Sequence, residues 1–287
     1  MKVLVTGAGG MLGSDLVAVL AASPSFTVTA ARRADLDLLS PSSVAAAVPG
    51  HDVVINAAAW TDVDGAESAE DEATALNGGA VATLASVCAS SGARLIQVST
   101  DYVLSGTATS PYPESAPVAP VNAYGRSKLV GEQAVLSLLP SSGYVVRTAW
   151  LYGAHGRNFA ATMLRLAASR DTVDVVDDQW GQPTWSLELA RQLVALASTP
   201  SAPAGIYHGT AAGATTWHGF AQAVFSLSGL DPARVRPTTS AAFVRPAVRP
   251  AYSVLGNDRW AAAGLSPMAD WRTSLAEAVS TGAVRAG

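Results

Sequence analysis

Short apolar runs alternate with amphipathic segments along the first half of the chain. One run, Asp-Val-Val-Ile-Asn at 52–56, is apolar at nearly every position, which is typical of a strand buried on both faces. The longer segments place apolar residues on one face at helical spacing, as Leu16, Val19 and Leu20 do. The pattern predicts strands at 2–6, 26–30, 52–56, 94–99 and 144–148, and helices at 14–22, 41–48, 72–90 and 124–139.

This order of elements predicts an α/β protein with a doubly wound parallel sheet of the Rossmann type. The pattern changes beyond Trp150, where helices are expected at 159–169 and 187–198. We therefore expect a dinucleotide-binding domain at 1–150 and a smaller, mixed and partly helical substrate-binding lobe at 151–287, interleaved with the sheet. The cleft beyond the carboxyl ends of the strands is the expected ligand site.

Composition favours small-molecule chemistry. The 287 residues are 49% hydrophobic and 14% charged, and the net charge of -4 comes without a basic stripe, so no nucleic-acid partner is expected. The first residues do not have the pattern of a signal peptide, and no apolar run approaches the roughly 18 residues of a membrane span, so a cytoplasmic location without membrane contact is expected. A single cysteine, Cys88, allows no internal disulfide and indicates no zinc site.

A glycine triplet lies between the first predicted strand and helix. Gly7, Gly10 and Gly13 have the spacing that a tight turn, close approach to a pyrophosphate and helix-on-strand packing require. The helix that follows would direct its N-terminus at the phosphates. A dinucleotide site is the favoured interpretation, and a purely structural glycine turn is the alternative.

The end of the second predicted strand bears on the choice of nicotinamide cofactor. An acidic residue at this place usually binds the ribose hydroxyls of NAD, whereas a 2'-phosphate calls for cations. The chain has Arg32 and Arg33 there, which favours NADPH and leaves NADH as the alternative, since two arginines can also be ordinary surface residues. Asp37 is a candidate partner for the adenine amino group.

A tyrosine and a lysine lie four residues apart at the start of a predicted helix. Tyr124 and Lys128 therefore project from one face, and Lys128 is one of only two lysines in the chain. A phenol has a pKa of about 10, and a nearby ammonium is expected to lower it toward the working range of an acid-base group. Thr100, at the end of the fourth strand, can bind a carbonyl, although such residues are often only turn formers.

Together these residues resemble the dTDP-4-dehydrorhamnose reductase family of the extended short-chain dehydrogenase/reductase superfamily. The resemblance covers nearly the whole chain, and its later motifs are more specific than the glycine triplet. The motifs are TGAGGMLG (6–13), DLDL (35–38), NAAAWTDVDGAE (56–67), STDYVLSG (99–106), PVNAYGRSKLVGE (120–132), RTAWLYG (147–153), NF (158–159), DDQWGQPT (177–184), GIYHGTAAGATTW (205–217) and RPAYSVL (249–255).

The resemblance implies reduction of the C4 keto group of a dTDP-bound deoxysugar by NADPH. It implies a catalytic set of Thr100, Tyr124 and Lys128, in which Lys128 also holds the nicotinamide ribose. Cofactor contacts are expected from Gly7, Gly10, Met11, Leu12, Gly13, Arg32, Arg33, Asp37, Leu38, Ala58, Ala59, Trp60 and Thr61. Substrate contacts are expected from Asp101, Tyr102, Trp150 and Asn158.

Several positions depart from the family pattern. Leu104 stands where phenylalanine is usual and Trp185 where a small residue is common, so the resemblance implies conversion of dTDP-4-dehydrorhamnose to dTDP-L-rhamnose and leaves another deoxysugar, bound in a changed pocket, as the alternative. Some relatives pair through carboxylates around a divalent cation. Asp15 could supply one carboxylate, but Leu187 stands where another is expected. No metal and no such metal-bridged dimer is therefore expected, and the chain is expected to be a monomer or another homodimer.

Three other functions fit the same fold. Sugar-nucleotide dehydratases have Asp-Glu after the catalytic threonine, whereas here Asp101 is followed by Tyr102. Epimerases retain a tightly held NAD, which a cationic 2'-phosphate site does not favour. A non-catalytic regulatory subunit, as in methionine adenosyltransferase, is disfavoured by an intact Thr100, Tyr124 and Lys128.

Overall fold

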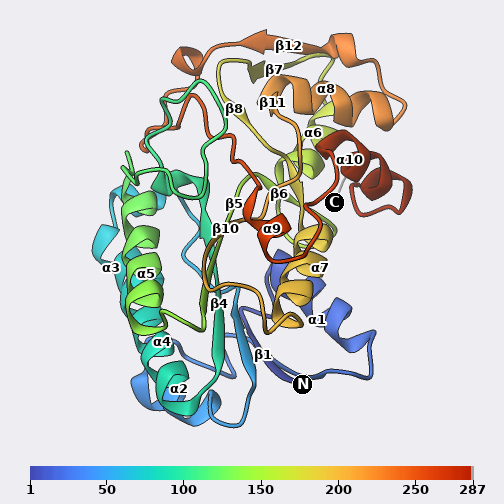
Figure 1. Cartoon of the computed structure of the whole chain (residues 1–287). Coiled ribbons are helices and arrows are strands. Elements are labelled where there is room, and N and C mark those ends of the chain that lie inside the picture. Colours follow the sequence, from blue (N-terminus) through green and yellow to red (C-terminus); the bar gives the residue numbers. More distant parts are fainter. Residues whose placement is uncertain (286–287) are drawn as a thin grey trace.

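Six parallel strands form the central sheet of the protein. The computed structural model describes residues 1–285 (Figure 1). The strands run in the order β2-β1-β3-β4-β5-β10, so the direction of winding reverses between β1 and β3, where open α/β sheets bind their ligands. The bounds are β1 (Lys2–Thr6), β2 (Thr27–Ala31), β3 (Val53–Asn56), β4 (Arg94–Thr100), β5 (Gly143–Thr148) and β10 (Gly205–His208).

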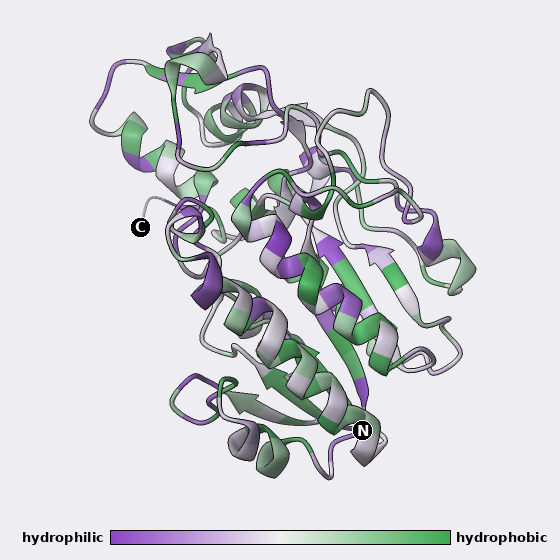
Figure 2. Cartoon of the chain, turned by 90° about the vertical axis from the view of Figure 1, so that its left-hand side faces the viewer, coloured by the Kyte–Doolittle hydropathy of each residue, from purple (hydrophilic) through white to green (hydrophobic). Residues whose placement is uncertain are grey.

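Helices cover both faces of this sheet. On one face α1 (Met11–Ala21) and α7 (Ser186–Ala197) pack against each other, and on the other lie α2 (Pro41–Ala47), α4 (Ala80–Ser91) and α5 (Ala123–Leu138). Each strand contributes alternate residues to the two cores, as neighbouring side chains in a strand must. The predicted doubly wound α/β sheet is confirmed, and Figure 2 shows long hydrophobic stretches along its strands.

One helical stretch, Glu70–Ser91, is long and apolar enough by composition to cross a membrane. It is made of α3 (Glu70–Thr74), the π-helical turn η2 (Ala75–Gly79) and α4. In the structure α4 packs between α2 and α5 over the sheet, and 44% of the apolar window is buried. Cores of water-soluble domains contain helices of this kind, so the composition alone is weak evidence for a membrane span.

A second core lies under the helices that follow β5. These helices are α6 (Phe159–Ala167), α8 (Trp217–Leu227) and α10 (Trp271–Ser280). Three short strand pairs surround them: β7 (Val173–Val176) with β12 (Val235–Thr238), β8 (Trp180–Gly181) with β11 (Thr215–Thr216), and β6 (Leu151–Tyr152) with β9 (Thr184–Trp185). The remaining short turns are η1 (Gly65–Glu67), η3 (Asp101–Val103), η4 (Pro232–Arg234), η5 (Ser240–Ala242) and α9 (Arg259–Ala262).

The second half of the chain also contributes to the sheet layer. β10 pairs with β5, and α7 packs against α1. The buried residues Leu189, Tyr207 and Trp260 belong to the same core cluster as Val3 and Val5 of β1. The division of the chain at residue 150 stays a proposal.

Candidate active site

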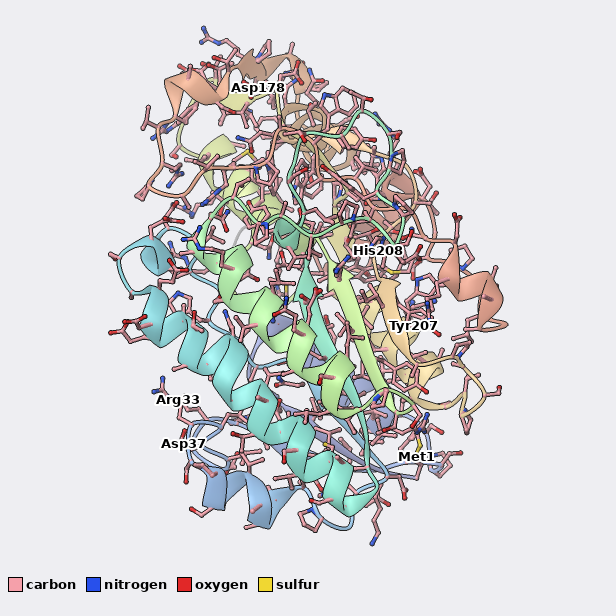
Figure 3. The ribbon with its side chains drawn as sticks, turned by 60° about the vertical axis from the view of Figure 1, so that its left-hand side comes forward. Met1, Arg33, Asp37, Asp178, Tyr207 and His208 are labelled. Carbon is pink, nitrogen blue, oxygen red and sulfur yellow. The ribbon has the colours of Figure 1, made fainter. Side chains whose placement is uncertain are left out.

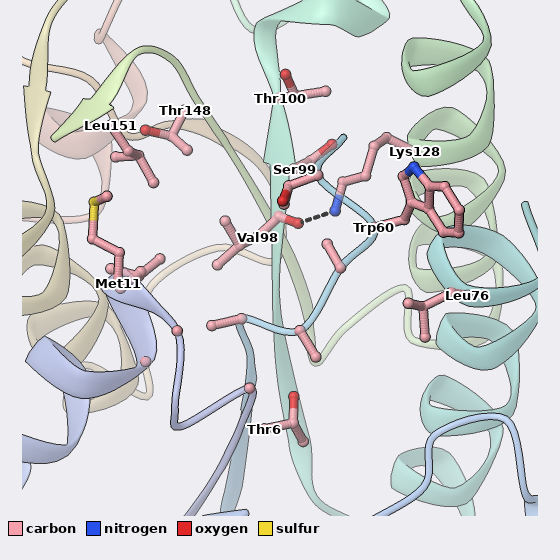
Figure 4. Close-up of a pocket in the computed structure, with 18 of the residues that line it drawn as sticks. Thr6, Met11, Trp60, Leu76, Val98, Ser99, Thr100, Lys128, Thr148 and Leu151 are labelled. Atoms are coloured by element: carbon pink, nitrogen blue, oxygen red, sulfur yellow. Dashed lines mark hydrogen bonds between the residues drawn. The ribbon is translucent and has the colours of Figure 1, made fainter. Parts of the chain in front are cut away.

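A cavity of about 1110 Å³ opens at the carboxyl ends of the strands, between the sheet and the helices that follow β5 (Figure 4). Segments that are distant in sequence supply its walls, because the ends of β1 to β5 meet at one edge of the sheet. The expected site residues that line it are Gly7, Gly10, Met11, Leu12, Gly13, Arg32, Arg33, Asp37, Leu38, Ala58, Ala59, Trp60, Thr61, Thr100, Asp101, Tyr102, Tyr124, Lys128 and Trp150.

The glycine loop packs its backbone tightly against the segment after β3 and against the start of α1. Gly7 has φ +67°, and a Cβ there would lie 2.6 Å from the backbone nitrogen of Ala58. A Cβ on Gly13 would collide with the Gly7 carbonyl, so glycine is needed where α1 passes the loop. The helix begins at Met11, earlier than the sequence predicted. Gly10 caps α1 without any side-chain hydrogen bond, so the first amides of the helix stay available to an anion. This cradle fits the pyrophosphate of a dinucleotide.

The end of β2 forms the far wall of the cavity. The methylene groups of Arg32 lie over the glycine loop, 3.7 Å from where a Cβ on Gly9 would be. Arg33 and Asp37 lie at the same edge of the molecule (Figure 3). One carboxylate oxygen of Asp37 accepts a hydrogen bond from the Leu39 amide at 3.0 Å. Two cations and one carboxylate therefore surround the place where the adenosine end of a dinucleotide would lie.

The wall that follows β3 is held by an asparagine that the sequence did not single out. Asn77, in η2, accepts a hydrogen bond from the Trp60 amide at 2.9 Å and donates to the Trp60 carbonyl at 3.1 Å. Its side chain also donates to the Ser127 hydroxyl of α5 at 3.0 Å. π-helical turns often occur at functional sites. Here the turn fixes a cavity wall relative to the helix that carries Tyr124 and Lys128.

The three expected catalytic side chains meet in this cavity. Asn122 caps α5 by accepting from the Gly125 amide at 2.8 Å, and Tyr124 and Lys128 therefore lie in the first two turns. The Lys128 ammonium donates to the Val98 carbonyl at 2.7 Å (Figure 4). Thr100, at the end of β4, donates to Asp101 at 3.0 Å. The end of β4 and the start of α5 thus bring a hydroxyl, a phenol and an ammonium into one cavity.

Burial sets the protonation of these groups. It lowers the pKa of Lys128 to about 8, and the charge of Glu132 partly opposes that shift. Burial raises the pKa of the Tyr124 phenol, and the Asp101 charge acts in the same direction. The expected lowering of the Tyr124 pKa by Lys128 is therefore wrong, because burial dominates and the ammonium is bonded to the Val98 carbonyl. Tyr124 is a protonated acid at neutral pH.

Asp101 offers a buried acceptor beside the catalytic set. It is 3% exposed, and burial raises the pKa of its carboxyl to about 6. One oxygen accepts from Thr100 at 3.0 Å, while the other has no partner of normal hydrogen-bond geometry among the residues that the structure describes, although the nearby Ser253 hydroxyl opposes the rise in the carboxyl pKa. A buried acceptor without a partner is costly, and a ligand hydroxyl would satisfy it.

Two indole rings close the side of the cavity next to the second core. Trp150 has φ +48°, an uncommon conformation for a non-glycine residue that often marks a functional position. Its ring stacks on that of Trp217, with centroids 3.6 Å apart and 10° between the planes. Gly181 lies against the same ring, because a Cβ there would be 2.6 Å from the Trp150 Cζ2. Trp217 was present in a quoted motif, but its position in the cavity was not predicted.

Asn158 is not among the lining residues, in contrast to the substrate contact expected for it. Its side chain accepts from the Ala161 amide at 3.0 Å, which caps α6, and donates to the Gly153 carbonyl at 3.0 Å. The sequence carried the relevant signal, since asparagine before an apolar helical segment is a common N-cap.

The departures from the family pattern lie away from the cavity. Leu104 and Trp185 are buried in two separate cores and do not line it. Among residues 1–285 no group of three or more His, Cys, Asp or Glu side chains could hold a metal ion. The lining residues that were not expected are Thr6, Gly9, Ala31, Leu36, Leu39, Ala57, Val63, Glu72, Leu76, Val98, Ser99, Thr148, Ala149, Leu151, Gly156, Arg157 and Trp217.

Comparison with known proteins agrees with this geometry. The family model for the RmlD substrate binding domain matches residues 1–284. The chain is 53% identical to dTDP-4-dehydrorhamnose reductase from Streptomyces griseus, covering 99% of this chain and 95% of the relative. It is 52% identical to dTDP-4-keto-6-deoxy-D-glucose reductase from Streptomyces niveus, covering 96% and 95%.

A solved structure shows the same fold. The dTDP-4-dehydrorhamnose reductase of Bacillus anthracis, in complex with NADP, superposes with a TM-score of 0.93 at 34% identity, covering 98% of this chain and 99% of that one. The resemblance noted in the sequence is thereby confirmed. The chain belongs to the dTDP-4-dehydrorhamnose reductase family of oxidoreductases, within the extended short-chain dehydrogenase/reductase superfamily.

Proposed function

We propose that this protein reduces the C4 keto group of a dTDP-4-keto-6-deoxysugar with NADPH, converting dTDP-4-dehydrorhamnose to dTDP-L-rhamnose. The observation that carries the proposal is the convergence of Thr100, Tyr124 and Lys128 in one cavity with the glycine loop. The names of the relatives and the NADP complex of the Bacillus anthracis enzyme support it.

The geometry supports a division of labour among the side chains. When bound, the nicotinamide supplies the hydride. Thr100 orients the carbonyl oxygen, and Tyr124 gives its phenolic proton to that oxygen as negative charge develops on it. The raised pKa of Tyr124 suits this role, because reduction requires the phenol to begin protonated. Lys128 holds the nicotinamide ribose and adds positive charge near the developing alkoxide.

The substrate contacts follow from the same walls. We assign the unpartnered carboxylate oxygen of Asp101 to a sugar hydroxyl. The Trp150 ring, supported by Trp217, forms an apolar surface against which a deoxysugar can lie, and Tyr102 lines the cavity in contact with the Tyr124 ring. Such a surface suits a sugar that has a methyl group in place of a hydroxymethyl group.

NADPH is proposed over NADH because of the charges at the adenosine end. Arg32 and Arg33 line the cavity there, and Asp37 already accepts a hydrogen bond from its own loop. Two guanidinium groups suit a 2'-phosphate, since charge-assisted hydrogen bonds to phosphate are strong.

Another dTDP-keto-deoxysugar is the second candidate substrate. The two relatives described above are almost equally similar to this chain, and their names specify different sugars. Identity at this level therefore does not select between them. The cytoplasmic location, the lack of nucleic-acid and membrane partners, and the monomer or homodimer stay predictions.

The test is NADPH oxidation in the presence of each keto-sugar. The wild type is compared with Tyr124→Phe and with Tyr252→Phe, a matched change outside the cavity. We expect Tyr124→Phe to lower kcat about 10²- to 10⁴-fold while NADPH still binds, and Tyr252→Phe to have little effect. The ratio of kcat/KM values for the two keto-sugars then identifies the better substrate. A wild type that binds NADPH but oxidises it with neither sugar would contradict the reductase proposal and favour a regulatory subunit.

A further inference from the structure

The segment that joins β6 to α6 lies beside the first turns of α1. A Cβ on Gly153 would collide with the Ser186 hydroxyl, and that hydroxyl donates to the Asp15 carboxylate of α1 at 2.5 Å. The His155 ring lies 3.8 Å from the same carboxylate. Asp15 is four residues after Met11 and therefore lies one turn further along the same face of α1. The segment thus passes close to the helix N-terminus that forms one side of the glycine loop.

The two ends of this segment are joined by a hydrogen bond. Asn158 donates to the Gly153 carbonyl and caps α6. Residues 153–158 therefore form a compact loop. It packs on Ser186 at its start, lies near Asp15 through His155 in its middle, and is closed by Asn158 at its end. Arg157 directly precedes Asn158 and lines the same cavity as Gly9 and Gly10. No hydrogen bond or ion pair engages its guanidinium among the residues that the structure describes.

The glycine loop itself, residues 7–13, contains no basic residue. The first turn of α1 contains no acidic residue that would repel an anion. Lys128 is bonded to Val98, and Arg32, whose methylene groups lie over Gly9, is assigned together with Arg33 to the 2'-phosphate at the adenosine end. The Asp15 carboxylate is engaged by Ser186 and does not line the cavity. Arg157 therefore adds an exposed positive charge to the cavity lining, on a loop that lies beside α1.

We propose that Arg157 binds the diphosphate of the nicotinamide cofactor, so that loop 153–158 adds a charged contact to the neutral amide donors at the N-terminus of α1. This inference rests on the proposed function, because it takes a dinucleotide as the ligand. Guanidinium groups bind phosphate oxygens in bidentate fashion, and the glycine loop supplies only neutral donors. Asn158 is a positioning residue in this arrangement, since it holds the loop closed next to Arg157.

The test is the affinity of the free enzyme for NADPH, measured by titration calorimetry without any sugar. We expect Arg157→Ala to raise the Kd for NADPH about tenfold, which corresponds to about 1.4 kcal/mol, and the effect to shrink at high salt. Arg165→Ala removes the same charge from an exposed position on α6 that does not line the cavity, and its Kd should stay within about twofold of the wild type. Adenosine 2'-monophosphate, which has no diphosphate, should bind equally to the wild type and Arg157→Ala.

Three results would overturn the inference. These are an unchanged NADPH affinity in Arg157→Ala, an equal loss in Arg165→Ala, and a loss confined to the binding of dTDP, the other diphosphate that the cavity would receive. Failure of the wild type itself to bind NADPH would instead count against the proposed function. Asn158→Ala gives an independent readout: it should weaken NADPH binding in the wild type but add little in Arg157→Ala, as expected for residues that act through one contact.

Discussion

The indole rings of Trp150 and Trp217 stack face to face, 3.6 Å between centroids, although the two residues are distant in the sequence. Trp150 lies two residues after the end of β5, in a left-handed backbone conformation, and Trp217 is the first residue of α8. The stack therefore ties the end of the central sheet to the second core at the wall of the cavity. Both rings line the cavity, so a change at Trp217 should reach the sugar through the position of the Trp150 ring.

Replacing Trp217 with leucine should loosen the Trp150 ring and raise the KM for the keto-sugar about two- to tenfold. This range corresponds to the roughly 0.5–1.5 kcal/mol of an aromatic pair. The Kd for NADPH should be unchanged, because the glycine loop lies at another wall. Trp180→Leu removes an exposed indole that does not line the cavity and serves as the control. Equal effects of the two changes on KM would show that the stack has no part in substrate binding.

The sheet was predictable because its signals are local. Each strand is a short apolar run, and the glycine triplet marks the first turn, so β1 to β5 and the cofactor loop follow from neighbouring residues. β10 was not predicted, because only Ile206 and Tyr207 are apolar in Gly205–His208, whereas β3, of the same length, has three consecutive apolar residues. It becomes a strand through pairing with β5.

The side-chain environment was less predictable, because it depends on contacts between distant segments. Spacing alone suggested that Lys128 lowers the Tyr124 pKa, whereas burial raises it and Lys128 is bonded to Val98. The cavity position of Arg157 likewise depends on where loop 153–158 lies beside α1, whereas the Asn158 cap is local and was readable from the sequence. Residue types were thus readable from the sequence, but their partners were not.

Arg32 and Arg33 should determine the choice between NADPH and NADH. The double change to alanine should raise the KM for NADPH at least about tenfold, because two charge-assisted contacts to the 2'-phosphate are lost. The KM for NADH should stay within about twofold, since that cofactor has no such phosphate. Steady-state kinetics with both cofactors checks this expectation. A parallel rise for NADH would mean that the arginines support the fold of the loop and do not read the phosphate.

The Arg147–Glu132 ion pair should be essential for stability. Both side chains are 1% exposed, their closest atoms are 2.7 Å apart, and Glu132 also accepts from Ser99 at 2.6 Å. Glu132→Ala leaves a buried guanidinium without its partner and should cost about 3–5 kcal/mol of unfolding free energy in urea. Glu70→Ala breaks the exposed pair with Arg126, whose side chains are 41% and 45% exposed, and should cost less than about 1 kcal/mol. Similar losses in the two variants would contradict this contrast.

The pH dependence of cofactor use should report the proton on Lys128. Burial lowers its pKa from 10.5 to about 8, so the free enzyme loses the ammonium as pH rises through about 8. Because the ammonium is the form that holds the ribose, kcat/KM for NADPH should fall above pH 8, and kcat/KM reports the free enzyme. The Tyr124 phenol does not produce this decline, since its pKa is raised.

Lys128→Arg separates this assignment from other alkaline effects. A guanidinium stays protonated throughout the range, so the variant, although slower, should show no decline in kcat/KM between pH 8 and 10. The stability of the wild type should move in the opposite direction to its activity. Between about pH 8 and 10.5 the unfolded chain binds the Lys128 proton and the folded chain does not, so this group's contribution to unfolding free energy rises with pH. An alkaline decline that persists in Lys128→Arg would assign the titration to another group.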